Sequence, residues 1–246
     1  MLGRYNQRTR VVFDGHVLTD YFLVGNPELP MPSPVTSMRD VAGMDGALPD
    51  GQRLQQVELA VTVSAWEDSR SDRRALMSML WQWLRVDEPK PLQIGDEPYW
   101  LAIPSGGGDM EHFANADAVE VRFVAADPVR YGATRSAAIP SGGSVSIHVG
   151  GNYPTRPRIT AAAAVRASNG LWGIRLDDGD YSNVSIPTAS ASAVIIDAST
   201  REVRVAGAPA MITLSSDWLE LEPGEHTLAM TQGTGAAVIE WQERWL

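Results

Sequence analysis

The chain has 246 residues, of which 44% are hydrophobic and 20% charged, a composition typical of a folded globular protein. Its net charge of −10, with scattered basic residues, argues against a nucleic-acid partner, because binding to phosphates needs clustered Lys and Arg. The absence of cysteine excludes disulfides, thiol catalysis and thiolate metal sites. No apolar run reaches the roughly 20 residues of a membrane span, and the first residues lack a secretion signal. We therefore expect no membrane partner and synthesis in the cytoplasm.

The first predicted element is a β-hairpin. The apolar run 11–13 is followed by Asp14-Gly15 and a second run from His16, and Asp-Gly between two such runs favours a two-residue turn. The chain from Asn26 to Asp50 then changes character, because it contains five prolines and two glycines. Proline cannot donate to a sheet ladder, so we expect a long irregular arm that is either mobile or grips a neighbouring molecule.

One strand and one helix are predicted next. Residues 57–63 alternate apolar and polar side chains, which indicates a half-buried strand. A helix is expected over residues 71–85, capped by Asp68 or Ser71. Its apolar face consists of Leu76, Met79, Leu80, Trp83 and Leu84. Trp81 lies off that face.

The remaining predicted elements are strands. In the first half they are residues 91–94 and 99–103, which flank a turn at 95–98, and residues 119–123. A Gly-, Ser- and Ala-rich stretch over 131–151 places a domain boundary between residues 1–136 and 137–246. The second half shows evenly spaced apolar runs at 145–149, 171–176, 193–196, 203–205, 211–214 and 236–241. Such spacing predicts an all-β sandwich or barrel, so the fold class is mainly β with one helix.

No catalytic constellation emerges from the sequence. The four histidines are far apart, and no nucleophile elbow, P-loop or dinucleotide fingerprint is present. The acidic cluster Asp177, Asp178 and Asp180 is interpreted as an exposed turn rather than a calcium site. The stretch 105–108 is interpreted as a hairpin tip rather than an anion-binding loop. We predict no catalytic residue, cofactor or metal, although a carboxylate pair of the glycosidase kind stays open.

The eight tryptophans divide into core and surface candidates. Those in the second half, at 172, 218, 241 and 245, are expected mostly in the core. Trp81 is the better candidate for a contact between subunits. Trp172 with Arg175 is the one local candidate for contact with a glycan.

The order of these features resembles one protein family, the distal tail proteins (Dit) of siphophages. In the first half the resemblance rests on 13–15, 19–24, 41–46, 96–100 and 123–128, and in the second half on 151–157 and 218–224 followed by a Trp-rich closing strand. It covers nearly the whole chain, and it is the order and spacing of these segments that carries it. Met44 departs from the family pattern, which has a charged residue before Asp-Gly in many relatives.

The resemblance implies a structural role in the phage tail tip. It implies a ring-forming amino-terminal domain over 1–136, a galectin-like carboxy-terminal sandwich over 137–246, and a homo-hexameric hub ring. The implied partners are the tail tube protein, the tail-associated tip protein and receptor-binding or accessory proteins, and the implied location is the virion. The candidate subunit contacts are Trp81, Met44 and Asp45, the last two from the arm.

Two other functions remain open from the sequence. The second domain is alternatively a carbohydrate-binding adhesin module, which a glycan titration tests. A tail-borne hydrolase is the other, although no nucleophile or metal constellation supports it.

Overall fold

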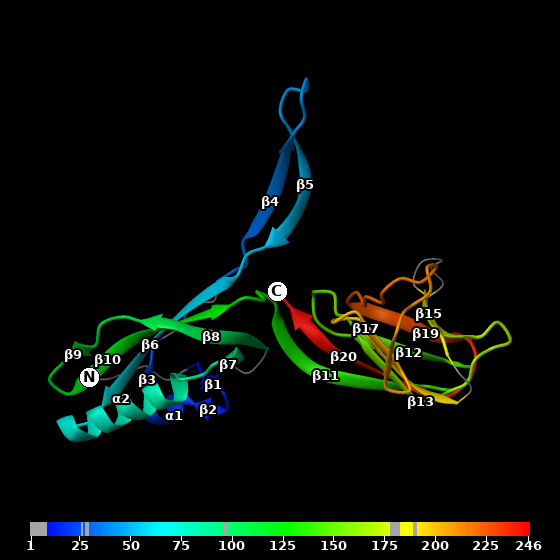
Figure 1. The fold of residues 1–246 in the computed structure, drawn as a ribbon. Coiled ribbons are helices and arrows are strands. Elements are labelled where there is room, and N and C mark those ends of the chain that lie inside the picture. The colour runs from blue at the N-terminus through cyan, green and yellow to red at the C-terminus, as the bar shows by residue number, and fades with distance from the viewer. Residues whose placement is uncertain (1–8, 26, 28–29, 96–97, 178–182, 189–190) are drawn as a thin grey trace. The chain divides into compact units, whose positions relative to one another are not determined.

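The computed structural model confirms a mainly β protein (Figure 1). It describes residues 9–25, 27, 30–95, 98–177, 183–188 and 191–246. The chain divides into two compact units, one that ends at Tyr131 and includes Leu246, and one from Gly132 to Trp245. The division falls within strand β11 (Arg130–Ile139), which also contains the boundary expected from composition.

The first unit is built on an antiparallel sheet with the strand order β11-β8-β10-β6-β3. Its strands are β3 (Leu23–Val24), β6 (Val57–Trp66), β8 (Tyr99–Gly107) and β10 (Ala116–Ala125), with β9 (Glu111–His112) beside β10. The prediction of a half-buried strand over 57–63 is confirmed. The residues of β6 from Val57 to Ala65 that point to one face are buried, and the alternate residues face outward. Strand β7 (Lys90–Ile94) pairs with β8, which confirms the predicted strand-turn-strand, although Asp96 and Glu97 lie outside the described residues.

The opening hairpin is confirmed. Strand β1 (Val11–Phe13) pairs with β2 (His16–Val17), and both turn residues, Asp14 and Gly15, adopt positive φ angles of 47° and 79°. This backbone twist matches the twist of the strands it joins. A short helix, α1 (Leu18–Tyr21), follows at once and was not expected.

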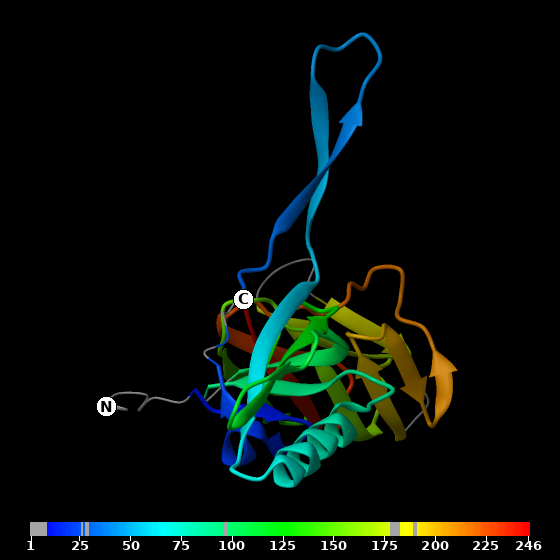
Figure 2. The ribbon, with the colours of Figure 1, turned by 90° about the vertical axis from the view of Figure 1, so that its left-hand side faces the viewer.

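The predicted helix is present as α2 (Arg70–Leu84), along one side of the first unit's sheet (Figures 1 and 2). Its N-cap is Ser69 rather than Asp68 or Ser71, and the buried face consists of Arg73, Met77, Leu80 and Leu84. Arg73 is on this face because it forms an ion pair with the buried Asp117 of β10. Trp83 packs at the edge of the face, where its ring stacks on His16 with centroids 4.4 Å apart.

The arm is not irregular, contrary to the sequence expectation. Strands β4 (Pro34–Asp40) and β5 (Ala47–Leu54) form a two-stranded antiparallel hairpin, which Figure 2 shows as two strands twisting about each other. The prolines are tolerated because Pro34 is the first residue of its strand and each strand has only one paired edge. The ends of the hairpin meet, since the amide of Gln55 donates to the carbonyl of Ser33 at 3.0 Å.

The second unit is a β-sandwich. One sheet has the order β12-β19-β14-β15, and the other runs β18-β17-β16-β13-β20-β11. The strands are β12 (Ser144–Val149), β13 (Arg158–Ala164), β14 (Leu171–Leu176), β15 (Asn183–Pro187), β16 (Ser192–Asp197), β17 (Glu202–Val205), β18 (Ala208–Ala210), β19 (Gly224–Gln232) and β20 (Ala237–Trp245). Residues from both sheets, such as Trp172, Ile174, Ile239 and Trp241, form one buried core.

Two local predictions are wrong. Residues 211–214 form no strand; the strand lies just before them as β18, and Met211 and Leu214 are highly exposed. The stretch Ser105–Gly107 is not a hairpin tip but the end of β8, opposite Val121 and Arg122 of β10. The ring of Trp81 lies against the strand there, and a Cβ at Gly107 would lie 3.2 Å from its Cη2 atom, so a larger residue would require the ring to shift.

Candidate interaction surfaces

The described residues include several exposed apolar surfaces. No group of three or more His, Asp or Glu side chains suited to a metal ion occurs among them. No helix of the described chain is long and apolar enough to cross a membrane. Asp178 and Asp180 of the acidic turn lie outside the described residues.

The first such surface is the β4–β5 hairpin. Between Pro34 and Leu54 only Val35 and Leu54 are half-buried, and every other residue is exposed. Met44 and Asp45 lie in the turn at its tip, where Met44 is 44% exposed. Neither strand pairs with another described strand. A hairpin of two strands is marginally stable in water on its own, so packing against a partner would stabilise this one.

The second surface surrounds Trp81. Its side chain lies off the buried face of α2, 44% exposed, with one edge of its ring against β8 at Gly107. The indole is thus held in place by the sheet while much of it faces solvent. A large, positioned aromatic of this kind is the residue type most enriched at the centres of protein interfaces.

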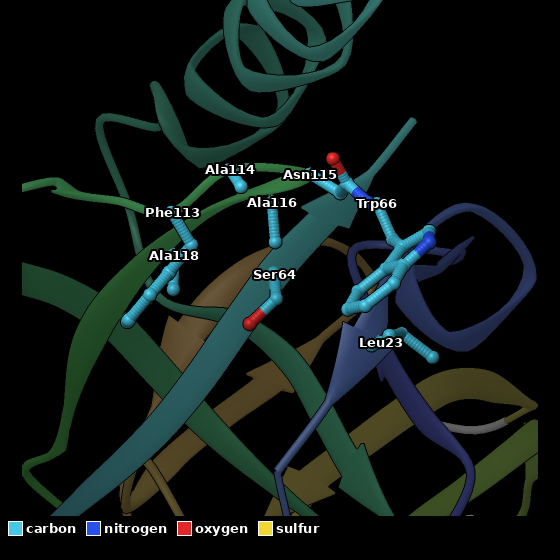
Figure 3. Close-up of a pocket in the computed structure, with 8 residues that line it drawn as sticks. All are labelled: Leu23, Ser64, Trp66, Phe113, Ala114, Asn115, Ala116 and Ala118. Atoms are coloured by element: carbon cyan, nitrogen blue, oxygen red, sulfur yellow. The ribbon is translucent and has the colours of Figure 1, made fainter. Parts of the chain in front are cut away.

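The third surface is a hollow that the sequence analysis missed, here called the Trp66 hollow. It lies on the outer face of β6 and β10 (Figure 3). The residues that line it are Leu23, Ser64, Trp66, Phe113, Ala114, Asn115, Ala116 and Ala118. The register explains the arrangement, because Trp66 lies opposite Ala116 and Ser64 lies opposite Ala118. Trp66 and Phe113 are each 57% exposed.

A sequence signal for this hollow exists. In the alternating run of β6 the buried positions are Val61, Val63 and Ala65, so Trp66 falls on the outward parity with Thr62 and Ser64. A tryptophan at an outward position, across from small alanines, indicates an apolar surface that is a candidate interaction site.

The candidate glycan site does not have the exposure it would need. Trp172 is fully buried in the sandwich core, and its position in β14 faces inward beside Ile174. A stacked sugar requires an accessible ring face. Arg175 is half-buried and lies across from Asn183 of β15 in the sheet register. The adhesin alternative gains no support from this pair.

One histidine of the second unit, His226, is held in place by hydrogen bonds. His226 is held from both sides, since its Nδ1 lies 2.8 Å from Oδ2 of Asp177 and its Nε2 lies 2.6 Å from the carbonyl oxygen of Glu222. Both partners are acceptors, so both ring nitrogens must donate, which requires the protonated imidazolium. Partial burial opposes this charge, but the bonds to Asp177 and Glu222 outweigh it and raise the pKa of His226.

Comparison with known proteins identifies the class. Residues 14–125 match a family model described as a phage tail protein RIFT-related domain, and residues 150–245 match the C-terminal domain of a siphovirus-type tail component. The chain is therefore a structural component of a phage tail. It belongs to the distal tail protein (Dit) family of siphophages, as the order of its sequence features indicated.

Solved structures agree on the fold. The crystal structure of the SPP1 Dit (gp 19.1) protein, described as a paradigm of the hub adsorption apparatus in phages that infect Gram-positive bacteria, matches with a TM-score of 0.77 at 22% identity over 96% of this chain and 99% of that one. A chain of the phage P2 baseplate in its activated, calcium-containing conformation matches with a TM-score of 0.51 at 9% identity, over 93% and 92%. No curated protein matches the chain in sequence.

Proposed function

We propose that this protein forms the hub ring at the distal end of a siphophage tail, as a homo-hexamer. In that role it joins the tail tube protein to the tail-associated tip protein and docks receptor-binding or accessory proteins. Family membership supports the location in the tail tip, and the match to the SPP1 hub protein supports a fold suited to it. The division of labour follows the two domains predicted from the sequence, with residues 1–136 forming the ring and the sandwich of 137–246 serving as the dock.

The single observation that carries the proposal is the β4–β5 hairpin. A subunit of a ring must present two different surfaces, one that reaches out and one that receives. The hairpin is the reaching surface, because its residues make no sheet with the rest of the described chain and are almost all exposed. Met44 and Asp45 at its tip, together with Trp81 on α2, are the proposed contact residues.

The test is the mass of the purified protein by light scattering, with negative-stain images alongside. We expect ring-shaped particles with the mass of about six subunits. A variant in which Asn-Gly replaces Pro34–Leu54 removes the whole hairpin and leaves its root intact, since Ser33 and Gln55 are already joined by a 3.0 Å hydrogen bond. This variant should remain folded and lose assembly.

The control is Met211→Ser, which removes a highly exposed apolar side chain from the second unit. It should assemble like the wild type. Rings formed by the hairpin-deleted variant would contradict the proposed role of the arm, and a wild type that stays monomeric at high concentration would contradict the ring.

A further inference from the structure

The two sheets of the second unit end in four edge strands, β18, β11, β15 and β12. An unpaired edge is a row of N–H and C=O groups to which a strand of another molecule can add, so proteins usually protect such edges. Strand β11 carries the exposed charge of Arg135, and a charged side chain is one of the common protections. The other three edges differ in how far they are protected.

Proline protects the edge at β18. The amide of Ala206 donates to the carbonyl of Ala193 at 2.7 Å, which fixes the alternation of bonds in this antiparallel sheet. Ala208 and Ala210 therefore direct their backbone groups at β17, and Pro209 between them directs its own outward. Since proline has no N–H, β18 offers no donor to an added strand.

A loop closes the edge at β15. The amide of Ser185 donates to the hydroxyl of Ser216 at 2.8 Å. The carbonyl oxygen of Ser185 accepts from the same hydroxyl at 3.2 Å and from the amide of Thr213 at 2.9 Å. The loop thus satisfies both the donor and the acceptor that a neighbouring strand would use. A strand could add to β15 only after displacing it.

Strand β12 has neither protection. The amide of Met230 donates to the carbonyl of Gly143 at 2.9 Å, and the register continues this alternation along β12 and β19. Every second residue of β12 therefore directs its backbone groups away from β19. These residues are Ser144, Ser146 and His148. The strand contains no proline and no carboxylate, and no other strand of the described chain pairs with it.

Both flanks of β12 are held in place. Before the strand, the hydroxyl of Ser141 accepts from the amide of Gly235 at 2.9 Å. After it, the amide of Asn152 donates to the carbonyl of Arg244 at 3.0 Å. An edge that is already ordered loses little conformational freedom when a partner binds, which favours association.

The pattern of side chains on β12 is symmetric about Ser146. Ser144 and His148, two residues away on either side, are both polar and exposed. Val145 and Ile147, its direct neighbours, are both apolar and belong to the core side of the sheet. In an antiparallel second copy, Ser146 lies opposite its own equivalent, and each neighbour lies opposite a residue of the same kind.

Charge and burial also suit a second copy. The chain has a net charge of −10, but β12 has no acidic residue, so two copies can approach along it without carboxylates lying directly opposite each other. On the core side Val145 is half-buried, whereas Ile147 is 4% exposed. Pairing would place Ile147 of the second copy beside Val145 and cover this open side of the core.

We propose that β12 pairs with β12 of a second copy of this chain, antiparallel about a two-fold axis at Ser146. The contact joins identical patches, so it links chains in twos, unlike the head-to-tail contact of a ring. Six residues from each copy are fewer than the roughly 20 to 30 of a standard interface, so the pairing is reversible and requires high protein concentration. This inference goes beyond the proposed ring and does not depend on it.

The absence of cysteine from the chain provides a direct test. Full-length Ser146→Cys is treated with a short bis-maleimide, and the products are separated on a denaturing gel. In the proposed pairing the two copies of position 146 lie about 5.5 Å apart between Cα atoms, within reach of the reagent. The control is Ser215→Cys, at an exposed serine of the loop that closes β15.

The expected result is a covalent dimer that forms at least tenfold faster from Ser146→Cys than from Ser215→Cys. Equal rates would overturn the pairing. Light scattering of the same samples separates this result from the proposed function. Rings without the faster cross-link would leave the ring and remove the β12 contact, and the faster cross-link without rings would do the reverse.

Hydrogen exchange of the β12 amides gives a second measurement. In the wild type the amides of Ser146 and His148 should exchange at least twofold more slowly at high protein concentration than at low. Ser146→Lys places like charges opposite each other at the two-fold axis but leaves the β19 ladder intact, and it should abolish this dependence. The control Thr231→Lys, on the same face of β19, should retain it. Exchange in the wild type that does not change with concentration would contradict the proposal.

Discussion

Arg73 of α2 and Asp117 of β10 form an ion pair in the interior of the first unit, with the Nε of Arg73 3.6 Å from Oδ2 of Asp117. Both side chains are less than a tenth exposed. His112 bonds to the other carboxylate oxygen at 2.7 Å, and this bond, assisted by the two arginines nearby, lowers the pKa of Asp117 against the opposing effect of burial. The pair fixes the helix to the sheet next to the Trp66 hollow.

Breaking this pair from one side should be costly. Asp117→Leu leaves the guanidinium of Arg73 buried without its counter-charge, and we expect a loss of about 3–5 kcal/mol in the free energy of unfolding. Adding Arg73→Met should restore most of it, because a well-packed apolar pair is often as stable as a buried ion pair. Urea unfolding followed by tryptophan fluorescence measures both. As a control, Arg122→Met breaks the exposed pair with Glu120 and should change stability by under about 1 kcal/mol. If Asp117→Leu were no less stable than Arg122→Met, the prediction would be wrong.

Gly151 should not tolerate a side chain. Its φ is +99°, and a Cβ there would lie 2.1 Å from the carbonyl oxygen of Arg244 in β20. We expect Gly151→Ala to cost more than about 3 kcal/mol, from the left-handed backbone and from the steric clash together. Gly142 is the matched control, since its φ is also positive but no atom lies within 4 Å of a Cβ. Gly142→Ala should cost only about 1–2 kcal/mol. If thermal melts showed equal losses of stability for Gly151→Ala and Gly142→Ala, the backbone at Arg244 would have to move aside, and the prediction would be wrong.

The His226–Asp177 pair predicts a pH dependence of stability. The pKa of His226 is raised in the folded state, so its contribution is complete below the ordinary value of about 6.5 and is lost as the pH rises through the folded value. The pKa of Asp177 is lowered, because hydrogen bonds from His226 and the Thr227 amide outweigh the effect of burial. Its contribution is present above about 3.9 and is lost as the pH falls through the folded value. The pair therefore contributes most between about pH 4 and 6.5.

His226→Gln isolates this effect. The difference in unfolding free energy between pH 5.5 and 8.5 should be smaller in His226→Gln than in the wild type. His148→Gln is the control, because His148 pairs with Glu225 at an exposed site. Proton NMR of the His226 ring gives its pKa directly, and a value at or below the ordinary one would refute the prediction.

The tryptophans should separate into two groups by stability. Trp172→Ala removes a fully buried ring, and we expect a loss of about 3–5 kcal/mol in the free energy of unfolding. Trp81→Ala removes a ring that is 44% exposed and should cost less than half of that in the single chain. Its larger effect should appear in the assembled fraction measured by light scattering. A Trp81 variant that assembles normally would remove this residue from the proposed contacts.

Local patterns predicted the fold well where burial on one face decides the structure. The alternation in 57–63 and the Asp14-Gly15 turn were sufficient for β6 and the first hairpin, because each depends on neighbouring residues. The prediction of the buried face of α2 was less complete. Arg73 looks like a surface residue in sequence, and only its pairing with Asp117, far along the chain, explains its burial.

The surfaces were harder to predict than the fold. Trp81 breaks the helical periodicity, which predicts a position off the buried face, and it lies at the surface. The arm was expected to be irregular because proline weakens a ladder, yet a two-stranded hairpin leaves enough free edges for Pro34 and Pro49. The Trp66 hollow depends on Ala116 lying across from Trp66, a register that no single segment reveals. Met211 and Leu214 are apolar but exposed, because no other element of the described chain covers them, and a short apolar run does not reveal this.

The hairpin also bears on how the free chain behaves before assembly. Two unpaired strand edges on an exposed hairpin are templates for adding further strands, the route by which β proteins aggregate. Here the edges are interrupted by Pro34 and Pro49, by the charges of Arg39 and Asp50, and by a shift in register between Thr36 and Met38. These interruptions let a crowded population of newly made chains stay dispersed until the right surface meets each arm.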